Sequence, residues 1–285
     1  KRYNPLNFTA ITFYGGEPLL NFSLIKECVN YINARYSNYD PKYNITTNGS
    51  LLSEDKANWL MQQDFGISVS LDGPEEEHDR NRIYASGRGT FKDVMRNIRR
   101  IMDSGYENIS CNPVIDWKTD IFKLQEFFNR KDVPKPSRSN QVVTNHGCRY
   151  YEEFTEEDYI TYVKRLKMAK EYYLNTLPSL GEIKRATFFD QMFRSNARSI
   201  IANSIPILKH PLLMPFTAAC VPGRKIFVDP DGNYYICERI CTRSPIIGNI
   251  NEGLNFERIY NMLYNYYNHL DKCPSCSIQR VCNQC

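Results

Sequence analysis

The stretch ITFYGGEPLL, residues Ile11 to Leu20, sets an apolar segment directly before two glycines, an acid and a proline. Ile11 and Phe13 fit a buried β-strand. Gly15 and Gly16 have no Cβ, so the backbone can turn sharply there and expose its carbonyl groups. Pro18 prevents the strand from continuing. We therefore predict a strand that ends at a ligand.

A helix is predicted directly after this strand and turn. Asn21 or Ser23 can cap it. Apolar residues then recur at helical spacing: Leu24, Ile25, Cys28, Tyr31 and Ile32. A strand, a glycine turn and a helix form half of a parallel α/β unit, in which ligands bind at the carboxyl ends of the strands.

The same unit recurs further along the chain. YNITTNGSLL, from Tyr43 to Leu52, gives a strand that ends at Asn48-Gly49, with Ser53 as the cap of the next helix. GISVSLDGPEEEHDRNR, from Gly66 to Arg82, gives a third strand, which ends at Asp72-Gly73-Pro74. The repetition predicts a parallel sheet, and we favour one curled into a barrel.

The remaining elements of this region are a helix, two strands and a helical insertion. The pattern predicts a helix over Phe91 to Ser104, closed by Gly105, and a fourth strand over Asn108 to Asp116. A fifth strand is predicted near Gln141 to Asn145. The insertion covers residues 154–174 and 183–205, and seven of its aromatic residues are predicted to face a core: Tyr159, Tyr162, Tyr172, Tyr173, Phe188, Phe189 and Phe193.

Composition excludes several classes of protein. The 285 residues, 42% of them hydrophobic, can fill one large α/β domain and a smaller module. A net charge of +4 from 36 basic and 32 acidic residues does not favour nucleic acid as a partner. Apolar runs are too short for a membrane helix. The chain begins at Lys1 without a methionine or signal segment, so we expect a fragment of a longer, cytoplasmic protein.

Seven of the ten cysteines fall between Cys220 and Cys285. A β-hairpin with its turn at Asp229 to Gly232 is predicted to carry Cys237 back towards Cys220. Two Cys-x2-Cys pairs follow, with only five residues between Cys276 and Cys282. Zinc remains an alternative, although zinc ribbons separate such pairs by about 15 to 20 residues. Iron-sulfur clusters are the other interpretation, since cysteine thiolates also bind these clusters.

Three signals in order, GGEP, TNG and SLDGP followed by His78-Asp79 and Arg82, resemble the radical S-adenosylmethionine (radical SAM) superfamily. The resemblance covers Ile11 to about Asp116 and implies a partial (β/α)6 barrel that binds S-adenosylmethionine. Backbone carbonyls and an acid would hold the methionyl ammonium, which carries only donors. The implied site has Gly15, Gly16 and Glu17 for the ammonium, and Asn48, Ser70, Asp72 and Arg82 for the ribose and carboxylate.

The cysteine tail resembles the SPASM domain, an auxiliary-cluster module of radical SAM enzymes that modify peptides and proteins. The resemblance implies 4Fe-4S clusters, with one ligand absent from this sequence. The implied metal ligands are Cys220, Cys237 and Cys285, with Cys241 as a further candidate, for one cluster, and Cys273, Cys276 and Cys282 for the other. The spacing before Cys285 is one residue shorter than the family's usual pattern.

The superfamily's Cys-x3-Cys-x2-Cys loop, which binds the cluster that cleaves S-adenosylmethionine, does not occur in the sequence. In the family this loop precedes GGEP, so we expect it upstream of Lys1. The expected organisation is a barrel over residues 1–150, a helical insertion or linker over 151–215 and a SPASM domain over 216–285.

The resemblance implies a maturase that installs a crosslink, with a cysteine thioether as the expected bond, in a ribosomally made peptide. Its partners would be the precursor peptide and an electron donor such as flavodoxin or ferredoxin, with no nucleic acid and no membrane. One alternative is an anaerobic sulfatase-maturating enzyme, which forms formylglycine with the same modules. Another is a relative without activity that binds a peptide or zinc.

Overall fold

The computed structural model describes residues 10–36, 40–137, 139–142, 149–176, 188–193, 225–238, 245–269 and 275. The chain divides into two compact units, one within residues 1–195 and the other within residues 196–285. Each unit is considered by itself.

The first unit is built on a parallel sheet, as predicted. Its strands lie side by side in chain order: β1 (Ala10–Phe13), β2 (Lys42–Thr47), β3 (Gly66–Val69) and β4 (Ile109–Cys111). All three neighbouring pairs are parallel. Two short strands, β5 (Val114–Ile115) and β6 (Asn140–Gln141), form a second parallel pair. The predicted α/β partial barrel is confirmed.

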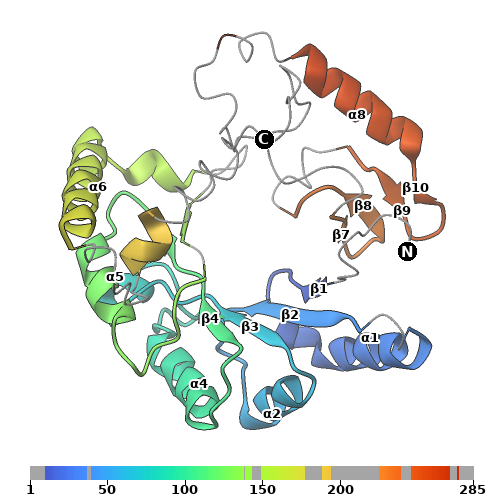
Figure 1. The fold of residues 1–285 in the computed structure, drawn as a ribbon, viewed down its shortest axis with the longest axis horizontal. Coiled ribbons are helices and arrows are strands. Elements are labelled where there is room, and N and C mark those ends of the chain that lie inside the picture. Colours follow the sequence, from blue (N-terminus) through green and yellow to red (C-terminus); the bar gives the residue numbers. More distant parts are fainter. Residues whose placement is uncertain are drawn as a thin grey trace. The chain divides into compact units, whose positions relative to one another are not determined.

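Helices cover the outer side of this sheet, where α1, α2, α4 and α5 follow one another (Figure 1). Buried apolar side chains from strands and helices share one core, which includes Ile45, Ile67 and Ile98. The helices are η1 (Pro18–Asn21), α1 (Phe22–Arg35), α2 (Glu54–Gln62), α3 (Glu75–His78), α4 (Phe91–Asp103), α5 (Ile121–Phe128), η3 (Tyr150–Glu153) and α6 (Glu156–Thr176). Within the described ranges, none is both long and apolar enough to cross a membrane.

The ends of two helices follow the sequence signals. Asn21 caps α1, because its side chain accepts a hydrogen bond from the Leu24 amide at 3.4 Å. Gly105 follows α4 with a φ of +78°, a left-handed conformation that glycine adopts without strain. Ser53 precedes α2 as predicted, but its side chain makes no capping hydrogen bond.

Two details of the prediction are wrong. The buried face of α1 carries Ile25 and Val29, whereas Leu24 and Tyr31 are exposed, so the buried stripe is rotated from the predicted one. The strand expected over Asn108 to Asp116 is broken into β4 and β5. Pro113 lies at the break, where it has no N–H to donate to a neighbouring strand.

The helical region after β6 packs on the core of the first unit. Tyr162 of α6 is buried, as are Phe188 and Phe189 of a helical segment over residues 188–193. Tyr159 and Tyr172 are about half exposed, at 48% and 51%, so the prediction that they face a core is wrong. Residues 183–187 and 194–205 of the predicted insertion lie outside the described residues.

The second unit contains a small antiparallel sheet. The predicted hairpin is confirmed as β7 (Phe227–Val228) and β8 (Asn233–Tyr235), and Gly232 at its turn has a φ of +80°. Two further strands, β9 (Gly248–Asn249) and β10 (Gly253–Leu254), extend this sheet, and α8 (Phe256–Asn268) follows. A small core joins Ile236 and Cys237 to Ile247 and Ile259.

Candidate functional site

The ends of β1, β2 and β3 meet at one edge of the sheet. Phe13 is level with Ile45, and Thr47 is level with Val69. The segments that follow these strands begin at Tyr14, Asn48 and Ser70. They therefore emerge together, at the edge where parallel sheets bind their ligands.

Glu17 joins the end of β1 to the end of β2. Its Oε1 accepts hydrogen bonds from Thr47 Oγ1 at 2.7 Å and from the Leu19 amide at 3.1 Å. Its Oε2 accepts one from the Asn48 amide at 2.7 Å. A carboxylate oxygen accepts about two hydrogen bonds, and among the described residues Asn48 alone donates to Oε2, which leaves one position for a ligand donor.

Gly15 and Gly16 lie open beside this carboxylate. Both are exposed, and apart from the adjoining residues no atom of the described part of the chain lies within 4 Å of the position that a Cβ would take on either residue. Neither has a positive φ, so the backbone conformation of the turn does not itself require glycine. The described residues leave this space free, which suits a ligand that approaches the backbone closely.

The Asn48-Gly49 turn is fixed from within the chain. Asn48 Oδ1 accepts hydrogen bonds from the Ser50 amide at 2.9 Å and from the Ser50 hydroxyl at 2.7 Å. Gly49 has a φ of +76°, and a Cβ there would lie 2.8 Å from Val69 Cγ1. The turn thus occupies the side-chain oxygen of Asn48, and the Asn48 NH2 group is the part that can serve a ligand.

Ser70 and Asp72 are held in different ways. The Ser70 amide donates to the Thr47 carbonyl at 2.9 Å, which extends the pairing of β2 and β3. The Asp72 carboxylate is buried and receives two hydrogen bonds from Arg82, at 2.6 and 3.1 Å, and one from the Val114 amide at 2.9 Å. Asp72 and Arg82 are therefore brought together as partners of each other. The Arg82 side chain remains 25% exposed and is the better placed of the two to reach a ligand.

His78 and Thr90 are residues whose roles the sequence analysis missed. His78 is fully buried, its Nδ1 accepts a hydrogen bond from the Asp72 amide at 3.3 Å, and its Nε2 lies 2.9 Å from Thr90 Oγ1. Burial lowers the pKa of His78 to about 4, against the opposing effect of the nearby Asp72 carboxylate. The imidazole is therefore neutral at physiological pH. The sequence alone indicates His78 only as part of the motif before Arg82.

A second polar cluster lies just after β5 and was also missed. Asp116 is buried and accepts hydrogen bonds from Arg80 Nη1 and from the Tyr150 hydroxyl, both at 2.6 Å. Burial would raise the pKa of Asp116, but the hydrogen bonds from Arg80 and Tyr150 lower it to about 2. The backbone amides of Lys118 and Thr119 also donate to it. This carboxylate is anionic and saturated with donors, so it ties η3 to the sheet and is a poor proton acceptor.

Of the predicted metal ligands, only Cys237 lies among the described residues. It is buried and follows β8 at the end of the hairpin, as predicted. The other six cysteines, Cys220, Cys241, Cys273, Cys276, Cys282 and Cys285, lie outside the described ranges. Within those ranges, no three His, Cys, Asp or Glu residues gather in a way that could hold a metal ion.

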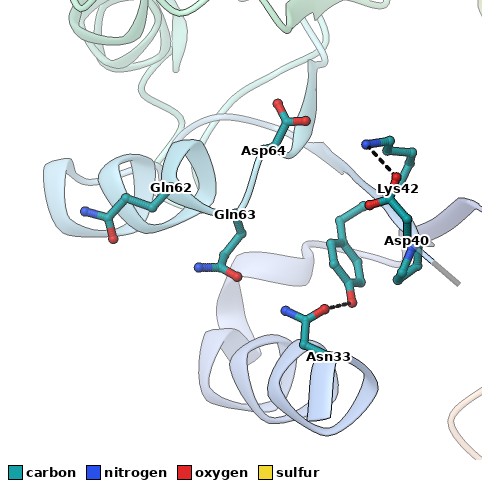
Figure 2. A pocket seen from close by; sticks show the side chains of 8 residues that line it. Asn33, Asp40, Lys42, Gln62, Gln63 and Asp64 are labelled. Carbon is teal, nitrogen blue, oxygen red and sulfur yellow. Dashed lines mark hydrogen bonds and ion pairs between the residues drawn. The ribbon is translucent and has the colours of Figure 1, made fainter. Parts of the chain in front are cut away.

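A pocket of about 420 Å³ lies at the opposite edge of the sheet (Figure 2). Lys42 begins β2 and Thr47 ends it, so this pocket is separated from Glu17 by roughly 16 Å, the length of the strand. Two pairs of its lining groups interact: the Tyr43 hydroxyl donates to Asn33 Oδ1 at 2.7 Å, and Lys42 Nζ lies 3.4 Å from an Asp40 carboxylate oxygen. It is therefore separate from the candidate site. It is lined by Asn33, Asp40, Pro41, Lys42, Tyr43, Gln62, Gln63 and Asp64.

This chain is similar to one known protein family and to several curated proteins. Residues 1–116 match the model of the Radical SAM superfamily. A cysteine-type anaerobic sulfatase-maturating enzyme of Clostridium novyi is 25% identical over 96% of this chain and 71% of its own length. A serine-type enzyme of the same description from Bacteroides thetaiotaomicron is 24% identical over 95% of this chain and 67% of its own.

A solved structure described as native anSMEcpe with bound AdoMet and Cp18Cys peptide has a similar fold. It aligns with a TM-score of 0.71 and 21% identity, covering 98% of this chain and 76% of the other. At that level of identity the likeness shows the fold alone.

Proposed function

We propose that the protein binds S-adenosylmethionine at the edge formed by β1 and β2 and modifies a peptide by radical chemistry, because residues 1–116 match the model of the Radical SAM superfamily. The observation that carries this proposal is the Glu17 carboxylate. It joins the two strand ends and keeps an acceptor position beside two glycines that no described residue covers.

The residues of this edge fit the methionyl end of S-adenosylmethionine. The ammonium has only donors, and Glu17 Oε2 with the bared backbone of Gly15 and Gly16 would supply acceptors. The Arg82 guanidinium would bind the carboxylate, which suits its planar pair of donors. The NH2 group of Asn48 would donate to a ribose hydroxyl. Ser70, at the end of the next strand, would also line the site, and Asp72 would hold Arg82 in place.

When bound to a reduced 4Fe-4S cluster, S-adenosylmethionine supplies a 5′-deoxyadenosyl radical that abstracts a hydrogen atom. The part of the protein described here would bind and orient the molecule and exclude water. We assign the predicted cysteine ligands, from Cys220 to Cys285, to auxiliary iron-sulfur clusters. Flavodoxin or ferredoxin would be the source of the reducing electron.

We propose that the substrate is a cysteine-containing peptide and that the product is a thioether crosslink. Forming the crosslink removes one hydrogen atom from carbon, which the 5′-deoxyadenosyl radical would take up, one proton from the thiol, and one electron, which an auxiliary iron-sulfur cluster would accept. Oxidation of a cysteine to formylglycine is the second candidate. It is favoured by the match to the Clostridium novyi enzyme, which extends over nearly the whole chain.

The test uses the protein at its full length, purified and reconstituted without oxygen. Given a reductant, it should contain iron and sulfide and should release 5′-deoxyadenosine and methionine from S-adenosylmethionine. The same protein without reductant is the control. Zinc in place of iron, with no 5′-deoxyadenosine formed, would instead indicate a relative without activity that binds a peptide or zinc.

A further inference from the structure

We propose that His78 and Thr90 are positioning residues that fix Arg82 for the carboxylate of S-adenosylmethionine. The inference rests on the proposed function and deepens it. Asp72 and Arg82 were expected near the ligand from their place in the sequence. The contacts of His78 and Thr90 explain how that pair is held in place.

Four residues form a closed ring of hydrogen bonds. The Asp72 amide donates to His78 Nδ1 at 3.3 Å, and His78 Nε2 lies 2.9 Å from Thr90 Oγ1. The Thr90 hydroxyl donates to the Arg82 carbonyl at 3.0 Å. The Arg82 side chain returns to the Asp72 carboxylate at 2.6 and 3.1 Å. The ring begins and ends at Asp72.

The direction of every bond in this ring is fixed. Nδ1 of His78 faces an amide N–H, so it must accept, and the neutral ring then carries its proton on Nε2. The Thr90 hydroxyl gives its only hydrogen to the Arg82 carbonyl, so it can only accept from His78. One tautomer and one hydroxyl orientation satisfy all four residues.

His78 and Thr90 cannot themselves serve as ligand contacts. His78 is 0% exposed and Thr90 is 8% exposed. The charged groups that face the imidazole are Asp72, Asp79 and Arg82, and the ring of Phe91 packs against it with centroids 5.9 Å apart. Their effect on a ligand must therefore pass through Arg82.

Arg82 is held at both ends by this arrangement. Its backbone N–H donates to the His78 carbonyl at 3.0 Å, and its carbonyl accepts from the Thr90 amide at 3.2 Å. A free arginine side chain has many rotamers, and ordering them on binding weakens affinity. Because the ring orders Arg82 in advance, the guanidinium is ready for an anionic group before the ligand arrives.

The test compares Thr90→Val with Thr90→Ser in the full-length protein. Valine keeps the shape but removes the hydroxyl, which leaves His78 Nε2 without its acceptor and removes one of the two hydrogen bonds to the Arg82 carbonyl, since the backbone amide at position 90 still donates to it. We expect the dissociation constant for S-adenosylmethionine, measured by calorimetry, to rise about tenfold in Thr90→Val. Thr90→Ser keeps the hydroxyl and should stay within about twofold of the unchanged protein.

A stability control and a spectroscopic measurement separate positioning from general destabilisation. Ile101→Val removes one buried methylene group from the last turn of α4 and should leave the affinity unchanged. Nitrogen-15 spectra of the histidine side chains should show His78 with its proton on Nε2 at neutral pH.

Equal affinities for Thr90→Val and Thr90→Ser, or a His78 proton on Nδ1, would overturn the positioning role. A failure of the unchanged protein to bind S-adenosylmethionine would overturn the proposed function itself.

Discussion

Replacing Glu17 by alanine in the full-length protein should raise the dissociation constant for S-adenosylmethionine by about 100-fold. The substitution removes a charge-assisted hydrogen bond to the ammonium, worth about 1.5 to 3 kcal/mol. It also releases Thr47 Oγ1 and the Asn48 amide, which Glu17 holds at 2.7 Å each. Calorimetric titration of the reconstituted protein measures the change.

Glu27→Ala is the matched control, because Glu27 is an exposed acid on α1 and its removal changes the net charge equally. It should bind S-adenosylmethionine like the unchanged protein. The unfolding free energy of Glu17→Ala should fall by about 1 to 2 kcal/mol for the lost internal hydrogen bonds, while the protein stays folded. An unchanged affinity in the folded variant would remove Glu17 from the site.

Gly16→Val should abolish measurable binding of S-adenosylmethionine while leaving the fold intact. Apart from its chain neighbours, no atom among the described residues lies within 4 Å of the position of a Cβ at Gly16, and its φ is not positive, so this part of the chain can accept the side chain. The unfolding free energy should change by no more than about 1 kcal/mol, since such replacements restrict the unfolded chain. The side chain would fill the space that we assign to the ligand.

Gly49→Ala provides the opposite case. A Cβ at Gly49 would lie 2.8 Å from Val69 Cγ1, at a φ of +76°. This variant should therefore lose about 1 to 3 kcal/mol of stability, measured by chemical unfolding.

If Gly16→Val bound S-adenosylmethionine with unchanged affinity, the ligand would not approach the backbone at Gly16.

Local signals were enough to predict the strand ends of the site. Gly15, Gly16 and Glu17 follow an apolar strand in an order that can be read without a structure. The partners of Glu17 could not be predicted in this way, because Thr47 lies 30 residues away and reaches Glu17 only through the parallel register of β1 and β2.

The ring around His78 shows the same limit more strongly. His78 and Thr90 are 12 residues apart, and their contact depends on how α3 and the start of α4 pack. Asp72 and Arg82 were both predicted as site residues, but their pairing with each other was not. The sequence shows which polar residues lie near strand ends. The packing decides which of these side chains already hydrogen-bond to other residues of the chain.

The helices α5 and α8 were not predicted, for a simpler reason. α5 and α8 lie in stretches that carried no motif, yet both have clear caps. The Asp120 side chain accepts from the amides of Phe122 and Lys123, and the Asn255 side chain accepts from the amide of Arg258. Reading caps together with apolar spacing, as for Ile259 and Leu263, would have found both helices.

Mass spectrometry of a cysteine-containing precursor peptide after anaerobic incubation with the full-length protein, reductant and S-adenosylmethionine tests the central claim most directly. The peptide should lose about 2 Da per crosslink, and the cysteine should no longer react with iodoacetamide, because its sulfur is bonded to carbon. A loss of about 18 Da at one cysteine would indicate formylglycine instead. An unchanged mass across the precursors encoded near the gene, with S-adenosylmethionine intact, would contradict the assignment of this protein as a peptide-modifying radical enzyme.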